Sequence, residues 1–179
     1  VSIGKVVAET AARVCAGELR QVAQRRNWEL TESEYISIIS DKSAAFFGGC
    51  CRLGALLSEA QPDQIEAMAR YGLNAGIAFQ IADDLLDIAG HESRTGKTAQ
   101  CDLAKSKLTL AVIHLLRDVD SAARERVRTI LDQPAEAADE LAEMLDLHGS
   151  LEYARNRARQ YVQISIEALE SVPSGDAKD

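Results

Sequence analysis

The chain has 179 residues, a length that suits one domain and is short for two. Its 28 acidic and 20 basic residues give a formal charge of −8, which argues against a duplex nucleic-acid binder and against adhesion to an anionic membrane. With only 3 Pro and 11 Gly, the composition favours an all-α fold.

Apolar residues at helical spacing predict a series of helices along the chain. A capping-box signature, Thr31 followed by Glu34, opens the second of them. The polar stretch 91–107 is expected to be a loop of functional length. We expect one partial domain over residues 1–172 and a disordered tail over 173–179. The predicted helices are a first one of about six turns that closes at Arg25 and Arg26, then 35–60, 63–89, 108–116, 121–131, 135–147 and 151–168.

The four cysteines show no metal-ligand spacing, so they are expected to be reduced core thiols in a cytoplasmic protein. They are Cys15, Cys50, Cys51 and Cys101. No run of 18 apolar residues and no signal-peptide layout is found, so no membrane insertion is expected. The chain begins at Val1 without a Met, inside a periodic apolar pattern, which suggests that the natural N-terminus lies upstream.

Three carboxylates and a glutamine share one arc of the predicted helix 63–89. On a wheel of about 100° per residue, Asp83, Asp84 and Asp87 fall about −60°, +40° and −20° from Gln80. Apolar residues fill the other directions. Such a helix is expected to be buried, with the polar arc facing an interior cavity.

This acidic arc is costly unless a cation offsets it. Asp83 and Asp87 at about 6 Å repel by roughly 3 kcal/mol at an effective dielectric constant near 20. Oxygen ligands without His or Cys suit a hard cation, and Mg²⁺ is usually held by one or two carboxylates with waters and substrate phosphates. The alternative is an ordinary acidic helix face in solvent.

Basic residues supply a second part of the pattern. Lys42 and Ser43 interrupt the apolar helix 35–60, and Arg94, Lys97, Lys105 and Lys107 lie in the loop after the acidic arc. Taken singly, Lys42 could pair with Asp41 at the surface, and the loop cations could be solvated. Taken with the carboxylates, they suggest a site where Mg²⁺ and ammonium groups bind a polyphosphate.

Several segments resemble the trans-type isoprenyl diphosphate synthases, the polyprenyl synthetase family. Residues 79–87 resemble the second aspartate-rich motif, FQxxDDxxD, and residues 17–21 resemble GExxQ. Residues 42–44 resemble the K[TS]A segment, and residues 96–109 resemble a GK…DL…KxT loop, with departures at Gln100, Cys101 and Ser106. The resemblance covers roughly residues 1–120.

The resemblance implies an isoprenoid-synthase helical bundle and a role for each matching residue. Asp83 would be the main Mg²⁺ ligand, with Asp84 and Asp87 acting through water or as second ligands. The allylic diphosphate would be held by Lys42 and Lys97, and Ser43 and Gln80 would add hydrogen bonds near it. Lys107 and Asp102 would order the loop that closes over the substrates. These expected site residues are Asp83, Asp84, Asp87, Lys42, Ser43, Gln80, Lys97, Asp102 and Lys107.

The implied activity is a prenyltransferase reaction, the Mg²⁺-dependent condensation of isopentenyl diphosphate head-to-tail with an allylic diphosphate, by a homodimer. The family's first aspartate-rich motif is missing, since 83–87 is the only DDxxD in the chain. Two hypotheses follow. The first is that the chain is part of an active elongase, and we expect this part to be inactive alone. The second is that the chain is a non-catalytic diphosphate-binding subunit of a heteromeric synthase. A terpene cyclase, the third hypothesis, would need an Asn/Asp, Ser/Thr and Glu metal motif, which the sequence does not show.

Overall fold

The computed structural model describes residues 2–89, 108–132 and 134–175, and all the regular elements in these ranges are helices. The all-α prediction is therefore confirmed. The elements are α1 (Ile3–Ala23), α2 (Glu32–Ile39), the π-helix η1 (Ser40–Ala44), α3 (Ala45–Leu57), α4 (Pro62–Ala89), α5 (Leu110–Asp118), α6 (Ser121–Asp132), α7 (Pro134–Leu147) and α8 (Ser150–Ala168).

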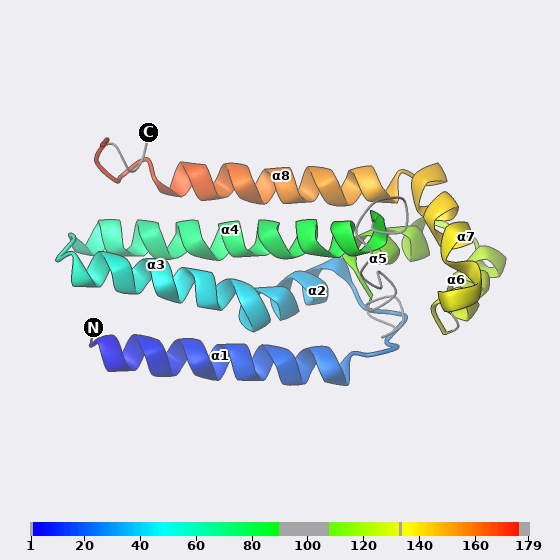
Figure 1. Cartoon of the computed structure of the whole chain (residues 1–179), viewed down its shortest axis with the longest axis horizontal. Coiled ribbons are helices and arrows are strands. Elements are labelled where there is room, and N and C mark those ends of the chain that lie inside the picture. Colours follow the sequence, from blue (N-terminus) through cyan, green and yellow to red (C-terminus); the bar gives the residue numbers. More distant parts are fainter. Residues whose placement is uncertain (1, 90–107, 133, 176–179) are drawn as a thin grey trace. The chain divides into compact units, whose positions relative to one another are not determined.

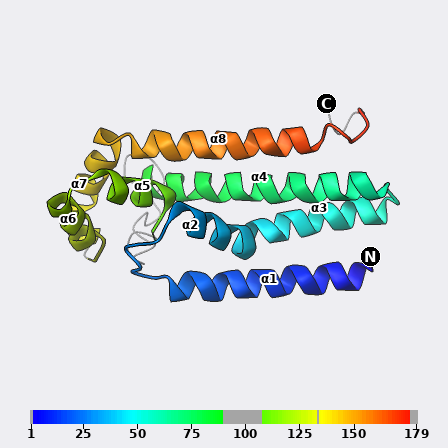
Figure 2. The ribbon, with the colours of Figure 1, turned by 180° about the vertical axis from the view of Figure 1, so that it is seen from behind.

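The chain forms two compact units, and α1, α2, α4 and α8 each have residues in both. The first unit comprises residues 1–21, 36–80 and 158–179. Its helices α1, α3 and α4 lie side by side (Figures 1 and 2). The second unit comprises residues 22–35 and 81–157. The single domain expected over 1–172 stays a prediction.

Close helix packing in the first unit depends on glycines. A Cβ added to Gly49 would lie 2.5 Å from the Thr10 hydroxyl on α1, and one added to Gly48 would lie 3.1 Å from the Ala69 carbonyl on α4. Small residues at these positions let α3 approach both neighbours, because an added Cβ would clash at Gly49 and would crowd the neighbouring backbone at Gly48. These glycines therefore serve helix crossings.

The second unit has an aliphatic core built by α5, α6 and α7. Thr109 caps α5 by accepting a hydrogen bond from the Val112 amide at 3.5 Å. The turn before α8 contains Gly149, whose φ of 64° lies in the left-handed region that favours glycine. The core side chains that are almost fully buried are Leu110, Val112, Leu115, Val127, Ile130, Leu131, Leu141 and Leu145.

Most predicted helix boundaries lie close to those in the structure, but α1 ends at Ala23, before the predicted Arg25 and Arg26, and the second helix differs more. That stretch is divided into α2, η1 and α3, with the π-helix placed at Asp41, Lys42 and Ser43. The capping box forms as predicted: the Thr31 amide donates to Glu34 Oε2 at 2.8 Å, and the Glu34 amide donates to Thr31 Oγ1 at 3.2 Å. A π-turn has no distinctive residue pattern, which is why periodicity did not locate it.

The cysteine prediction is partly wrong. Cys15, Cys50 and Cys51 are free thiols, but the first two are exposed and the third is only half-buried, so they are not core residues. Cys15 lies on α1, where only Val6 and Gly17 are buried. Most of that helix is therefore exposed in this chain. Cys101 lies outside the described residues. Among those residues, no helix has the length and apolar character needed to cross a bilayer.

Candidate metal and diphosphate site

The three aspartates near the end of α4 lie together, as the helical spacing predicts. A carboxylate oxygen from each of Asp83, Asp84 and Asp87 lies within 4.8 Å of the others. Asp84 is 3% exposed, and the other two are more accessible. We call these three residues the acidic cluster. It offers only hard oxygen ligands, and the set fits a magnesium-type cation.

The burial of the acidic cluster follows from the direction of each residue on α4. The buried side of this part of the helix carries Ile77, Ile81 and Ile88, and Asp84 is the aspartate nearest to them on the wheel. The opposite side carries Phe79 and Leu86, which are 55% and 69% exposed. The acidic cluster thus lies at the border between the two sides.

The prediction of a helix buried in every direction is therefore wrong for the described chain. No described element covers Phe79 and Leu86 enough to bury them, so the helix is buried along one side only. The expected interior cavity around the whole polar arc rested on that prediction. What the structure shows instead is one deeply buried carboxylate, Asp84, beside two more accessible ones.

A buried tyrosine contacts the acidic cluster, and sequence reasoning did not find it. Tyr35 on α2 is 3% exposed, and its hydroxyl donates a hydrogen bond to Asp84 Oδ2 at 2.7 Å. Burial, followed by the negative charge of Asp84, raises the pKa of Tyr35 well above its ordinary value, so the phenol stays protonated and can donate. The sequence showed Tyr35 only as the start of an apolar stretch.

Lys42 is held by two residues of the GExxQ segment. Its Nζ forms an ion pair with Glu18 Oε2 at 3.0 Å and donates a hydrogen bond to Gln21 Oε1. The alternative in which Lys42 pairs with Asp41 is not what the structure shows. Asp41 accepts hydrogen bonds from Arg13, at 2.8 and 3.0 Å, and from Arg20.

Close backbone contact brings α1 to Lys42. A Cβ on Gly17 would lie 2.2 Å from the Lys42 backbone nitrogen, so only glycine allows this approach. The approach places Glu18 and Gln21 on α1 beside the π-helix η1. Single π-turns inside α-helices are frequent at functional sites. The segment that carries Lys42 thus has both an unusual backbone and fixed partners.

Ser43 and Gln80 are also brought together, since the Ser43 hydroxyl donates a hydrogen bond to Gln80 Oε1. Both belong to the first unit, as does Lys42, whereas the acidic cluster belongs to the second. Gln80 and Asp83 are one turn apart on the continuous helix α4. The loop residues predicted for the site are Lys97, Asp102 and Lys107. These three residues, and also Arg94 and Lys105, lie outside the described residues.

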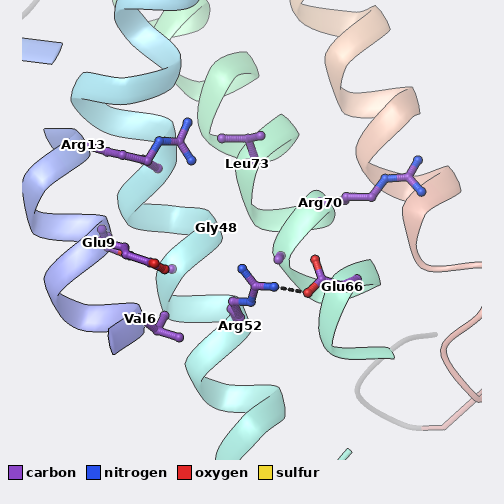
Figure 3. A pocket seen from close by; sticks show the side chains of 12 residues that line it. Val6, Glu9, Arg13, Gly48, Arg52, Glu66, Arg70 and Leu73 are labelled. Atoms are coloured by element: carbon purple, nitrogen blue, oxygen red, sulfur yellow. Dashed lines mark hydrogen bonds and ion pairs between the residues drawn. The ribbon is translucent and has the colours of Figure 1, made fainter. Parts of the chain in front are cut away.

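The first unit also holds an open groove of about 240 Å³ between α1, α3 and α4. Figure 3 shows Arg52 on its wall, directed toward Glu66, with which it forms an ion pair. Arg13 also lines the groove and is paired with Asp41. Both of these arginines therefore already have carboxylate partners.

Comparisons with known proteins agree with this fold. The fold is that of solved prenyl synthases: a decaprenyl diphosphate synthase from Rhodobacter capsulatus matches with a TM-score of 0.91 at 31% identity, over 98% of this chain and 55% of that one. The family model described as Polyprenyl synthetase matches residues 1–148. The chain belongs to the polyprenyl synthetase family.

Two further relatives are informative. A short chain isoprenyl diphosphate synthase from Methanothermobacter thermautotrophicus is 33% identical over 175 residues, which are 97% of this chain and 54% of that protein. A polyprenyl synthase from Caulobacter crescentus, solved in complex with calcium and isoprenyl diphosphate, matches with a TM-score of 0.89 at 27% identity, over 98% of this chain and 55% of that one. The chain thus spans about half the length of these relatives.

Proposed function

We propose that this chain is part of a trans-prenyltransferase that condenses isopentenyl diphosphate head-to-tail with an allylic diphosphate. The observation that carries the proposal is the acidic cluster on α4, in a chain that belongs to the polyprenyl synthetase family. The names of the relatives support it, since they are isoprenyl diphosphate synthases. The solved complex of the Caulobacter relative contains both a divalent cation and an isoprenyl diphosphate.

In this proposal the acidic cluster holds Mg²⁺, with Asp83 as the main ligand and Asp84 and Asp87 as further or water-mediated ones. The donor set fits, because it consists of three carboxylates whose oxygens lie within 4.8 Å and which repel one another without a cation. When bound, Mg²⁺ neutralises charge on the diphosphate and so makes it a better leaving group.

The chain's own polar residues would bind the diphosphate. The Lys42 ammonium would exchange its contacts with Glu18 and Gln21 for diphosphate oxygens, and Ser43 and Gln80 would donate hydrogen bonds. The loop residues keep the roles implied by the family motifs: Lys97 would bind the diphosphate, and Lys107 and Asp102 would order the loop that closes over the substrates. In the reaction the allylic carbon–oxygen bond breaks, the double bond of isopentenyl diphosphate attacks that carbon, and a proton is lost.

The chain is expected to be inactive alone, because it contains a single DDxxD motif. The same observation supports a second candidate function, a non-catalytic diphosphate-binding subunit of a heteromeric synthase. We propose a homodimer in the cytoplasm for the first function and a different partner polypeptide for the second. Mass measurement of the assembly purified from its source separates them, since a second polypeptide would contradict the homodimer.

Binding of inorganic pyrophosphate, measured by calorimetry with and without Mg²⁺, tests the site. We expect Mg²⁺-dependent binding by the wild-type chain, loss of that dependence in Asp83→Asn, and weaker pyrophosphate binding in Lys42→Met. Lys5→Met is the matched control, because Lys5 is an exposed lysine on α1 that pairs only with Glu9. Pyrophosphate binding that ignores Mg²⁺ and Asp83 would contradict the proposed function.

Turnover is a separate test. Extension of an allylic diphosphate by labelled isopentenyl diphosphate is expected to be undetectable with the purified 179-residue chain. Product formed by this chain alone would show that one aspartate-rich motif is sufficient and that the expectation of inactivity is wrong.

A further inference from the structure

The first turn of α2 is fixed by polar contacts on two sides. The capping box between Thr31 and Glu34 satisfies the free amides at its start. Glu32 accepts hydrogen bonds from the Tyr153 hydroxyl and, at 2.7 Å, from Arg157 Nε, both on α8. A helix start held in this way cannot rotate or slide without breaking several hydrogen bonds at once.

Tyr35 follows Glu32 by three residues, so it leaves α2 on the same side of the helix. Its ring is buried, and its hydroxyl reaches Asp84 on α4. Asp84 also lines a crevice with Ile81, Leu85 and Ile88 that is too narrow to admit a water molecule. Because a buried carboxylate is costly without hydrogen-bond donors, the hydrogen bond from the phenol stabilises Asp84 in this position.

We propose that Tyr35 is a positioning residue that holds Asp84, and through it the acidic cluster, in the arrangement that binds the divalent cation. The inference rests on the proposed function, because it assigns Tyr35 to the metal site of that function. Tyr35 does not itself contact the cation. It fixes one carboxylate and thereby the orientation of the last turns of α4.

The geometry of α4 explains how one fixed carboxylate affects the other two. Asp83 and Asp87 lie one turn apart, both on the same side of Asp84 on the wheel, so their directions depend on the rotation of this helix end. A hydrogen bond from α2 to Asp84 sets that rotation. Outer partners of metal ligands act in this way in other proteins, and their loss typically weakens metal binding by 10–100-fold.

The test is a titration of the 179-residue chain with Mn²⁺, followed by electron paramagnetic resonance of the free ion. Tyr35→Phe keeps the ring and removes only the hydroxyl, and we expect the Kd for Mn²⁺ to rise about tenfold. Tyr71→Phe is the matched control: it removes the same hydroxyl from a tyrosine on α4 that belongs to the first unit and lies outside the contacts that fix the first turn of α2. Its Kd should stay within about twofold of wild type.

Asp84→Glu provides a second, independent variant. It keeps the negative charge but moves the carboxylate by one methylene relative to the Tyr35 hydroxyl, so a position-dependent role predicts a similar loss of about tenfold. The double variant Tyr35→Phe with Asp84→Asn should bind no more weakly than Asp84→Asn alone, because the hydroxyl acts only through Asp84. Cooperative thermal unfolding in metal-free buffer establishes that each variant is folded.

Wild-type affinity in Tyr35→Phe would overturn the inference, as would equal losses in Tyr35→Phe and Tyr71→Phe. Were Tyr35→Phe unfolded, wild-type affinity in Asp84→Glu would overturn it. A failure of the proposed function looks different: the wild-type chain would bind no Mn²⁺, or Asp83→Asn would bind it unchanged. Either result would remove the metal site and the role of Tyr35 with it.

Discussion

The acidic cluster predicts that Asp83→Asn stabilises the metal-free chain while abolishing its response to Mg²⁺. Since the carboxylate oxygens lie within 4.8 Å of one another, one pair of charges repels by at least about 0.9 kcal/mol at the dielectric constant of water and by at least about 3.5 kcal/mol at an effective value near 20. Asp83 is more accessible than Asp84, so the lower figure applies to each of its two pairs. We expect a gain of about 1 kcal/mol after the repulsion that persists in the unfolded chain is subtracted.

Thermal unfolding followed by circular dichroism measures both effects. A gain of about 1 kcal/mol raises the Tm of a chain of this size by about 2–4 °C, and added salt should reduce the gain. In the wild-type chain, Mg²⁺ at ten times its Kd should add about 1.4 kcal/mol, whereas Asp83→Asn should gain almost nothing.

Asp63→Asn is the control for this prediction, because it makes the same change in the first turn of the same helix. A negative charge is favourable there, so this variant should lose about 0.3–1 kcal/mol. The reasoning is refuted if Asp83→Asn destabilises the metal-free chain or if it keeps the wild-type response to Mg²⁺.

Three further predictions concern the supporting structure. The capping hydrogen bonds to Thr31 lower the pKa of Glu34 below its ordinary value of 4.5, so their stabilisation is complete above about pH 4.5 and is lost as the pH falls through the lower folded-state pKa. The difference in free energy of unfolding between wild type and Glu34→Gln should therefore shrink as the pH falls below about 4.5, and a constant difference would contradict this. Gly17→Ala should lower the free energy of unfolding, measured in urea, by about 1–3 kcal/mol, because the added Cβ would lie 2.2 Å from backbone. Gly4→Ala, whose added Cβ has nothing within 4 Å, should raise it by about 0.5–1 kcal/mol. Changes of the same sign in the two variants would refute the packing argument. Burial raises the pKa of the Cys51 thiol, so iodoacetamide should label it more slowly than exposed Cys15, as peptide mass spectrometry can measure, and equal rates would contradict it.

Much of the helical fold could be predicted because the governing interactions are local. The periodicity of apolar residues, the capping box at Thr31 and Glu34, and Pro62 at the start of α4 all act within one or two turns. The π-helix at Lys42 was not predicted, because a π-turn depends on what packs beside it. Here α1 approaches at Gly17 and supplies Glu18 as a partner for Lys42.

The candidate site divides in the same way. That Asp83, Asp84 and Asp87 share one face follows from the geometry of an α-helix, and the sequence alone determined it. Which of them is buried was decided by the tertiary structure, since it depends on the elements that pack against one side of α4. Tyr35 reaches Asp84 across 49 positions of sequence. No local pattern encodes that hydrogen bond, because it exists only once α2 and α4 have packed together.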